Sequence, residues 1–153
     1  MTRRHESLIP LTHDHHHALA QARRLKAAAN DDVRKLLGQC QVFLDFFESD
    51  TVNHFREEEE VLFPLAVRDE RAVPLLRRVM MEHLEIHALV AALATQVTEG
   101  NPASQNAIEL AGALETHIRF EEGHLFPLLE EVIDEEQLRA IPLRDRERSD
   151  ARA

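Results

Sequence analysis

The sequence has no tryptophan, no tyrosine, one cysteine and four glycines among its 153 residues. A single cysteine excludes an internal disulfide framework and suits a reducing compartment. Scarce glycine beside abundant alanine and leucine is typical of an all-helical protein. The longest apolar run, residues 88–94, is far shorter than the ~20 residues needed to span a bilayer, and no apolar signal core follows the basic N-terminus. We therefore expect a cytoplasmic protein with no membrane partner.

Basic residues are also in short supply. The 18 Lys and Arg residues face 28 Asp and Glu residues, and the formal net charge is -10. A nucleic-acid partner requires a basic face that neutralises phosphates, so this balance argues against one. Hydrophobic residues make up 44% of the chain, and a chain of this length can bury roughly 68–70% of its unfolded surface. These values favour one compact domain.

Histidine, in contrast, is abundant. Ten are present, and all except His5 gather in four segments of the chain. Two of these segments spell nearly the same sequence, because HFREEEEVLFP at 54–64 returns as HIRFEEGHLFP at 117–127. Either a duplicated fold element or a site that takes the same ligands from two directions would explain such a repeat.

Apolar residues recur with a period of about 3.5–3.6 residues in four segments, which predicts four amphipathic helices. The four segments are residues 8–29, 33–65, 74–97 and 107–128. Residues 30–32 and 99–102 have the composition of turns. Short links between amphipathic helices predict an all-α, up-down-up-down four-helix bundle. We expect the bundle to span residues 1–133 and a charged tail to occupy residues 134–153.

The two halves of the chain match each other. One shift along the sequence aligns the first helix with the third, and a slightly smaller shift aligns the second with the fourth. The matched pairs are Asp14 with Glu82, His15 with His83, His54 with His117, and Glu58 with Glu121. An αα-hairpin has therefore been used twice, with an insertion or deletion between its helices. Two such hairpins around a pseudo-two-fold axis would bring four histidine-bearing faces into one core.

Each apolar stripe carries polar side chains, although burying one without a partner costs about 1–3 kcal/mol. These side chains are His15, His54, Glu58, His83, His87, His117 and Glu121. Residues four apart on a helix share a face at about 5–6 Å between Cβ atoms, so a pair can hold an ion. Imidazole and carboxylate ligands without thiolate suit iron, manganese or zinc, and inward Glu and His residues build di-iron sites in bundles. Such a ligand set on two ions leaves room for a bridging oxygen and an exogenous ligand.

Over roughly residues 8–132 the chain resembles the hemerythrin-like, or HHE cation-binding, domains. The matching segments are DHHHAL (14–19), HFREEEEVLFP (54–64), MEHLEIH (81–87) and HIRFEEGHLFP (117–127). The resemblance implies a bundle around a bridged non-heme di-iron centre, with zinc or manganese as possible substitutes for the two iron ions. It also implies binding or sensing of dioxygen or a related diatomic ligand. The alternative is a redox-active di-iron enzyme or an iron-centre repair protein of the stress response. We expect a sensor to need a separate protein partner.

The same resemblance implies a set of metal ligands. They are His15, His54, Glu58, His83, His87, His117 and Glu121. Alternatives on the first helix are His13, His16 and His17. Glu122 is the alternative to Glu121, and His87 is open because some family members use one histidine on this helix.

The repeated Leu-Phe-Pro segment carries no ligand atoms, so we predict a structural role for it. Pro64 and Pro127 each lie ten residues after a repeated histidine, or about 15 Å along a helix. We predict that both helices continue past the proline with a bend, because the apolar stripes run on. We expect His124 to bond in the core or to support a ligand. His54 of the second helix must lie level with His15 of the first if both bind in one layer. The second helix must therefore overhang the turn or break near Gly38.

Overall fold

The computed structural model describes residues 3–102 and 104–142, and the regular secondary structure in these ranges is entirely helical. The elements are η1 (Glu6–Leu8), α1 (Ile9–Ala28), α2 (Val33–Phe46), η2 (Phe47–Thr51), α3 (Val52–Glu57), η3 (Glu58–Leu62), η4 (Phe63–Leu65), α4 (Ala72–Thr98), α5 (Ser104–Phe120), η5 (Glu121–Leu125), α6 (Phe126–Val132) and α7 (Glu135–Arg139). Of the short elements, η1 and η4 are 3₁₀ turns, whereas η2, η3 and η5 are π-helical turns. The part of the expected tail beyond residue 142 lies outside the described residues.

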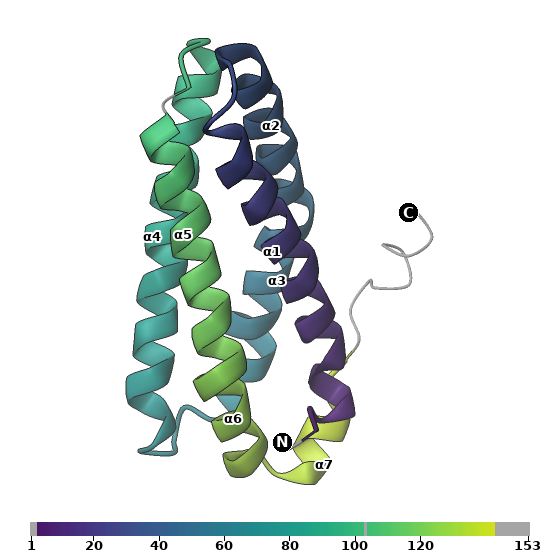
Figure 1. The fold of residues 1–153 in the computed structure, drawn as a ribbon. Coiled ribbons are helices and arrows are strands. Elements are labelled where there is room, and N and C mark those ends of the chain that lie inside the picture. Colours follow the sequence, from purple (N-terminus) through teal and green to yellow (C-terminus); the bar gives the residue numbers. More distant parts are fainter. Residues whose placement is uncertain (1–2, 103, 143–153) are drawn as a thin grey trace.

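These elements form four lines of helix that pack side by side (Figure 1). The chain rises in α1, descends through α2 and α3, rises again in α4 and descends through α5 and α6 (Figure 1). Helix α1 contacts α2 and α5, and α4 contacts the same two helices, so each line touches its neighbours in the sequence. The predicted all-α helical bundle is confirmed.

Two of the three links between the lines lie at the predicted turn residues, 30–32 and 99–102. Asp32 caps α2, because its Oδ1 accepts a hydrogen bond of 2.9 Å from the backbone N–H of Lys35, the usual role of an aspartate before a helix. In the second half of the bundle, α4 is followed by Gly100, whose φ of 69° is left-handed. Glycine adopts this conformation without a steric penalty, and it ends the helix.

Two apolar cores lie above and below a layer of buried polar side chains. The upper core includes Leu25, Phe43 and Leu93, and the lower core includes Leu76 and Phe126. The polar layer consists of His15, Thr51, His54, Glu58, His83, His117 and Glu121, each at most 6% exposed. The hydrophobic cores therefore hold the four helices at a fixed distance on both sides of this layer.

The two repeated prolines have different surroundings. The helix continues through Pro127, which lies in α6, so the prediction of continuation is confirmed there. It is wrong for Pro64, because this residue lies in the 3₁₀ turn η4 and residues 66–71 form turns. The sequence after Pro127 still offers buried Leu129 to the core, whereas residues 67–71 are mainly charged and have no apolar stripe to bury.

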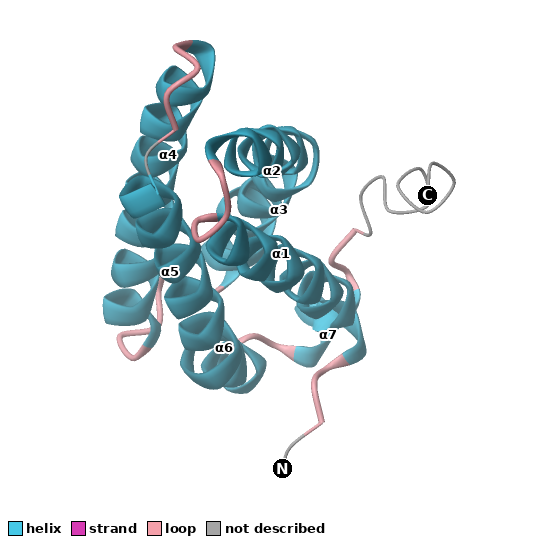
Figure 2. Ribbon diagram, turned by 45° about the horizontal axis from the view of Figure 1, so that its top comes forward, coloured by secondary structure: helices cyan, strands magenta, loops and turns pink. Residues whose placement is uncertain are grey.

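Helix α2 begins beyond the end of α1, and this overhang brings His54 to the level of His15. Helix α2 is continuous through Gly38, so no break occurs there. Instead, the link after α1 climbs to the higher start of α2 (Figure 1). Figure 2 shows the same link with the top of the bundle tilted toward the viewer.

The π-helical turns displace the apolar stripe by one residue. A π-turn adds one residue to a helical turn, so the residues after it face a different direction from that predicted by an α-helical period. After η5 begins, the buried residues are Leu125 and Phe126, whereas His124 is exposed. The expectation of a core role for His124 is therefore wrong.

At the lower end of the bundle, α7 turns back beneath the start of α1 (Figure 2). Leu138 of α7 is 1% exposed and belongs to the lower core. His5, which precedes α1, lies 3.1 Å from the carboxylate of Glu135. Packing of the bundle thus extends beyond residue 133.

Candidate metal centre

The polar layer contains two groups of side chains with the ligand types of a metal site. The first group is His15, His54, Glu58 and Glu121, and the second is Glu58, His83, His117 and Glu121. In each group, one ligand atom from every residue lies within 4.8 Å of the others. Because Glu58 and Glu121 belong to both groups, two neighbouring ions would share these two carboxylates.

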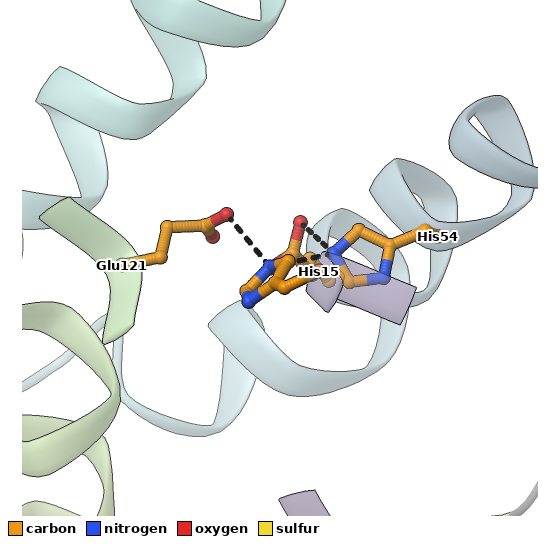
Figure 3. A group of neighbouring side chains, drawn as sticks. His15, His54 and Glu121 are labelled. Carbon is orange, nitrogen blue, oxygen red and sulfur yellow. Dashed lines mark hydrogen bonds and ion pairs between the residues drawn. The ribbon is translucent and has the colours of Figure 1, made fainter. Parts of the chain in front are cut away.

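Each line of the bundle contributes to the groups from its middle. The four histidines come from α1, α3, α4 and α5, and the two shared carboxylates are the first residues of η3 and η5. Each carboxylate lies four residues after a histidine of its own helix, so His and Glu share a face. Figure 3 shows His15 between Glu121 and His54, with contacts to both.

The histidines meet in pairs through the same ring nitrogen. The Nε2 atoms of His15 and His54 are 3.1 Å apart, and so are those of His83 and His117. The first pair joins the two helices of the first hairpin, and the second pair joins those of the second hairpin. Four Nε2 atoms therefore point into the layer, as the pseudo-two-fold repeat predicts.

Each shared carboxylate contacts one histidine of each pair. Glu58 Oε1 lies 3.3 Å from His54 Nε2 and 3.4 Å from His83 Nε2. Glu121 Oε1 lies 3.3 Å from His15 Nε2 and 2.8 Å from His117 Nε2. Both carboxylates thus contact both halves of the site.

Outside the groups, every histidine meets a second carboxylate through its other ring nitrogen. The Nδ1 atoms and their partners are His15 with Glu122 at 2.7 Å, His54 with Asp14 at 3.0 Å, His83 with Glu59 at 2.6 Å and His117 with Glu82 at 2.9 Å. A carboxylate that accepts from Nδ1–H fixes the tautomer and leaves the Nε2 lone pair of a neutral ring facing inward. This is the preparation that a metal-ligating histidine needs.

Sequence reasoning missed these outer carboxylates. Glu59 belongs to a glutamate run that is typical of a solvated face, and Glu122 was only an alternative ligand. The available signal was the repeat itself: an acidic residue precedes both His15 and His83, and another follows each shared carboxylate.

The chemistry of the cluster fits a cation. All four carboxylate oxygens of Glu58 and Glu121 are buried and have no hydrogen-bond partner in the described part of the chain. The nearby Nε2 atoms are close, but they are not aligned as donors to these oxygens. Buried anionic oxygens without donors are costly, and so are paired Nε2 lone pairs. Cations within the two groups would satisfy both sets of atoms.

Without a metal, protons would supply the positive charge. Burial lowers the pKa of His117, but the charge of the adjacent Glu121 outweighs this effect and raises the pKa to about 10. Burial also lowers the pKa of His54, yet the charge of Glu58 leaves it well above its usual value. Conversely, burial raises the pKa of Glu121, but the charge of His117 holds it well below the usual range. The layer therefore retains a strong preference for positive charge.

Six of the seven predicted ligands come together in this layer, whereas His87 does not. His87 is exposed and belongs to neither group. The ring of Phe55 stacks on His83 at a centroid distance of 3.8 Å and meets the ring of His87 edge-on at 5.7 Å. An aromatic ring thus fills the space beside His83 on this side.

The alternatives on the first helix lie outside the layer. The side chains of His13, His16 and His17 are exposed, whereas His15 is 2% exposed. Glu122 is 27% exposed and contacts the Nδ1 atom of His15 from outside the layer. Glu121 contacts the Nε2 atom of the same ring from within the layer.

A pocket between α1, the α2–α3 line and α5 reaches the first group. His15, His54, His117 and Glu121 form part of its lining. The apolar residues of its lining are Ala18, Phe46, Phe55, Leu114 and Ile118. The space open to the centre of a water molecule is about 20 Å³, which exceeds the ~10–15 Å³ needed for one water. The pocket therefore has the size for a molecule of a few atoms.

The chain matches the family model of the hemerythrin HHE cation-binding domain over residues 9–129. The chain belongs to the hemerythrin HHE cation-binding domain family. The match covers all four lines of the bundle and every residue of the two ligand groups. The searches of curated proteins and of solved structures gave no significant match. None of the described helices is both long and apolar enough to cross a membrane.

For a hemerythrin HHE domain, the buried His and Glu groups are the candidate cation-binding site. The family and the side-chain geometry point to the same layer, because the matched range contains both groups and the groups offer only nitrogen and oxygen ligands.

Proposed function

We propose that this domain holds two iron ions and binds or senses dioxygen or a related small diatomic ligand. The observation that carries the proposal is the placement of Glu58 and Glu121, each of which contacts one histidine from each half of the site. Two carboxylates in these positions serve two ions together, with two histidines left for each ion. Glu58, Glu121 and the four paired histidines are the proposed ligands, and His87 is not among them.

The donor set supports iron. It combines imidazole nitrogen with carboxylate oxygen and contains no thiolate, which suits iron, manganese or zinc. Inward Glu and His residues on facing helices are the established way in which bundles hold di-iron centres. Zinc or manganese would occupy the same residues after expression in metal-rich medium.

The ligand count leaves coordination positions for an exogenous molecule. Each group offers two histidines and two shared carboxylates, which is fewer than the six ligands of octahedral iron. When bound, iron would supply electron exchange with a small oxygen-containing ligand. The protein would supply a pocket that reaches the first group and an apolar wall that limits water, including Phe46, Leu114 and Ile118.

A redox enzyme or an iron-centre repair protein is the second candidate. It is favoured by the polar side chains of Asp14, His17 and Asp50, which also line the pocket and could deliver protons from solvent. A sensor, by comparison, would have to transmit ligand binding to a separate protein.

Spectroscopy of the iron-loaded protein separates these functions. The protein is reconstituted with ferrous iron without oxygen, exposed to air and then deoxygenated. A binding protein should recover its initial absorption spectrum through repeated cycles. Irreversible oxidation in the first cycle with turnover of hydrogen peroxide would instead support the enzyme or repair function.

A further inference from the structure

Thr51 is the buried polar residue of the layer that neither ligand group uses. Its side chain is 4% exposed, and its Oγ1 has no hydrogen-bond partner in the described part of the chain. Thr51 nevertheless lines the pocket that reaches His54 and Glu121. A hydroxyl buried without a partner destabilises a fold, so its position calls for a role.

Thr51 ends the π-helical turn η2, and its hydroxyl does not make the usual bond of a helical threonine to its own helix. A threonine inside an α-helix commonly donates to the carbonyl four residues earlier, as Thr95 does to Ala91 at 3.2 Å and Thr98 to Ala94 at 3.0 Å. Four residues before Thr51, the carbonyl of Phe47 accepts the backbone N–H of Val52. The Thr51 hydroxyl makes no such bond, and Thr51 belongs to the lining of the pocket.

The hydroxyl and the π-turn both break the internal symmetry. The alignment that matches His54 with His117 places Thr51 on Leu114, and it places η2 on regular α-helix within α5. Leu114 lines the same pocket. A purely structural repeat would have an apolar residue at both positions. The departure occurs at the wall of the pocket, above the first group.

We infer that Thr51 Oγ1 donates a hydrogen bond to the small ligand that enters this pocket, and thereby favours ligands with an acceptor oxygen or nitrogen. This inference rests on the proposed function, because it requires an iron-loaded site that is open to exogenous molecules. Thr51 is then a positioning residue, since it contacts the ligand but no metal. The apolar neighbours Phe55 and Ile118 strengthen the bond because they exclude competing water.

Azide is a suitable probe, because it binds ferric iron and accepts hydrogen bonds. Azide affinity is measured by titration of the iron-loaded protein and of three variants. Thr51→Val removes the hydroxyl and keeps the shape, Thr51→Ser keeps the hydroxyl, and Thr95→Val removes a hydroxyl from an exposed position of α4 outside the pocket. Thr51→Val should weaken azide binding about tenfold to a hundredfold, whereas the other two variants should stay near wild type.

A second readout distinguishes positioning from a structural role. The infrared stretching band of bound azide should shift between H₂O and D₂O in the wild type and in Thr51→Ser, but not in Thr51→Val. Without metal, Thr51→Val should melt at the same temperature as the wild type or higher, since a methyl replaces an unpaired hydroxyl. A lower melting temperature or lost iron in Thr51→Val would show a structural role and overturn the inference.

The two proposals fail in different ways. If wild-type protein with two irons binds no azide, the proposal that the iron site accepts exogenous ligands is wrong. The proposed role of Thr51 is then wrong as well. If the wild type binds azide and Thr51→Val has the same affinity and the same isotope shift, only the role of Thr51 is wrong.

Discussion

His15 and His54 lie on different helices, yet their Nε2 atoms are 3.1 Å apart and the Nδ1 atom of each ring faces a carboxylate. Neutral rings held in this way direct two lone pairs at the same point. Such a contact is unfavourable unless a proton or a metal ion lies between the nitrogens. The same relationship recurs between His83 and His117, so the chain repeats it in both halves of the site.

The two histidines of α4 provide a matched pair for testing the ligand set. His83→Ala should lower the metal content and the melting temperature, because a ligand that stabilises only the folded state is lost. His87→Ala should leave both unchanged, since His87 is exposed and lies outside both groups. Metal analysis and thermal unfolding check these outcomes. Equal loss of metal in the two variants would restore His87 as a ligand.

The carboxylates that contact the histidine Nδ1 atoms should affect metal affinity, because they hold the metal-binding rings in place. Glu59→Gln replaces the acceptor 2.6 Å from His83 Nδ1, and such changes cost roughly 10- to 100-fold in metal affinity. Glu60→Gln, one residue later and paired with exposed Arg56, is the control and should keep wild-type affinity. Competition with a chelator measures both. Identical affinities would show that Glu59 does not tune the site.

Stability of the metal-free protein should depend on pH in a defined direction. Folding raises the pKa of His117 to about 10 and the pKa of His54 well above its usual value, in each case because the charge of a buried glutamate outweighs burial. The folded state then binds more protons than the unfolded state above pH ~6.5, so stability falls as pH rises from there towards 10, by on the order of a few kcal/mol.

Metal ions compete with these same protons, so loading should strengthen as pH rises. The gap in melting temperature between metal-loaded and metal-free protein should therefore widen from pH 6.5 to 9. Thermal unfolding across this range measures the gap. A gap that narrows with rising pH would contradict the proposed exchange of protons for metal.

The packing of α7 predicts that the folded unit extends past residue 133. Leu138→Ala should destabilise the protein by about 2–5 kcal/mol, because it leaves a cavity in the lower core. Gln137→Ala, at an exposed position of the same helix, should change stability little. Denaturant unfolding compares the two. If both variants have wild-type stability, the bundle ends before α7.

Much of the fold could be predicted, because burial imposes a regular period on each helix. Four stripes predicted four helices, and the repeat predicted that polar residues such as His15 and His83 share one layer. The π-turns could not be predicted from that period, since nothing in the sequence around Glu121 interrupts it. For this reason His124 was assigned to the core although η5 places it in solvent.

The residues of the candidate site could be predicted only where they lie on an apolar stripe. Glu59 lies one residue from the stripe, and its contact with His83 depends on how two helices face each other. His87 lies on the predicted stripe, but the core packs on the neighbouring position, Ile86, which is 1% exposed. Such choices depend on the shapes of side chains on other helices, including the ring of Phe55.

The central claim is that the buried layer holds two ions bridged by Glu58 and Glu121. Metal analysis of protein reconstituted with ferrous iron without oxygen tests it most directly. The account predicts about two irons per chain in the wild type, and loss of both in Glu58→Ala or Glu121→Ala, because each carboxylate serves both ions. Reconstituted wild-type protein without bound iron, or with one iron that survives either substitution, would contradict it.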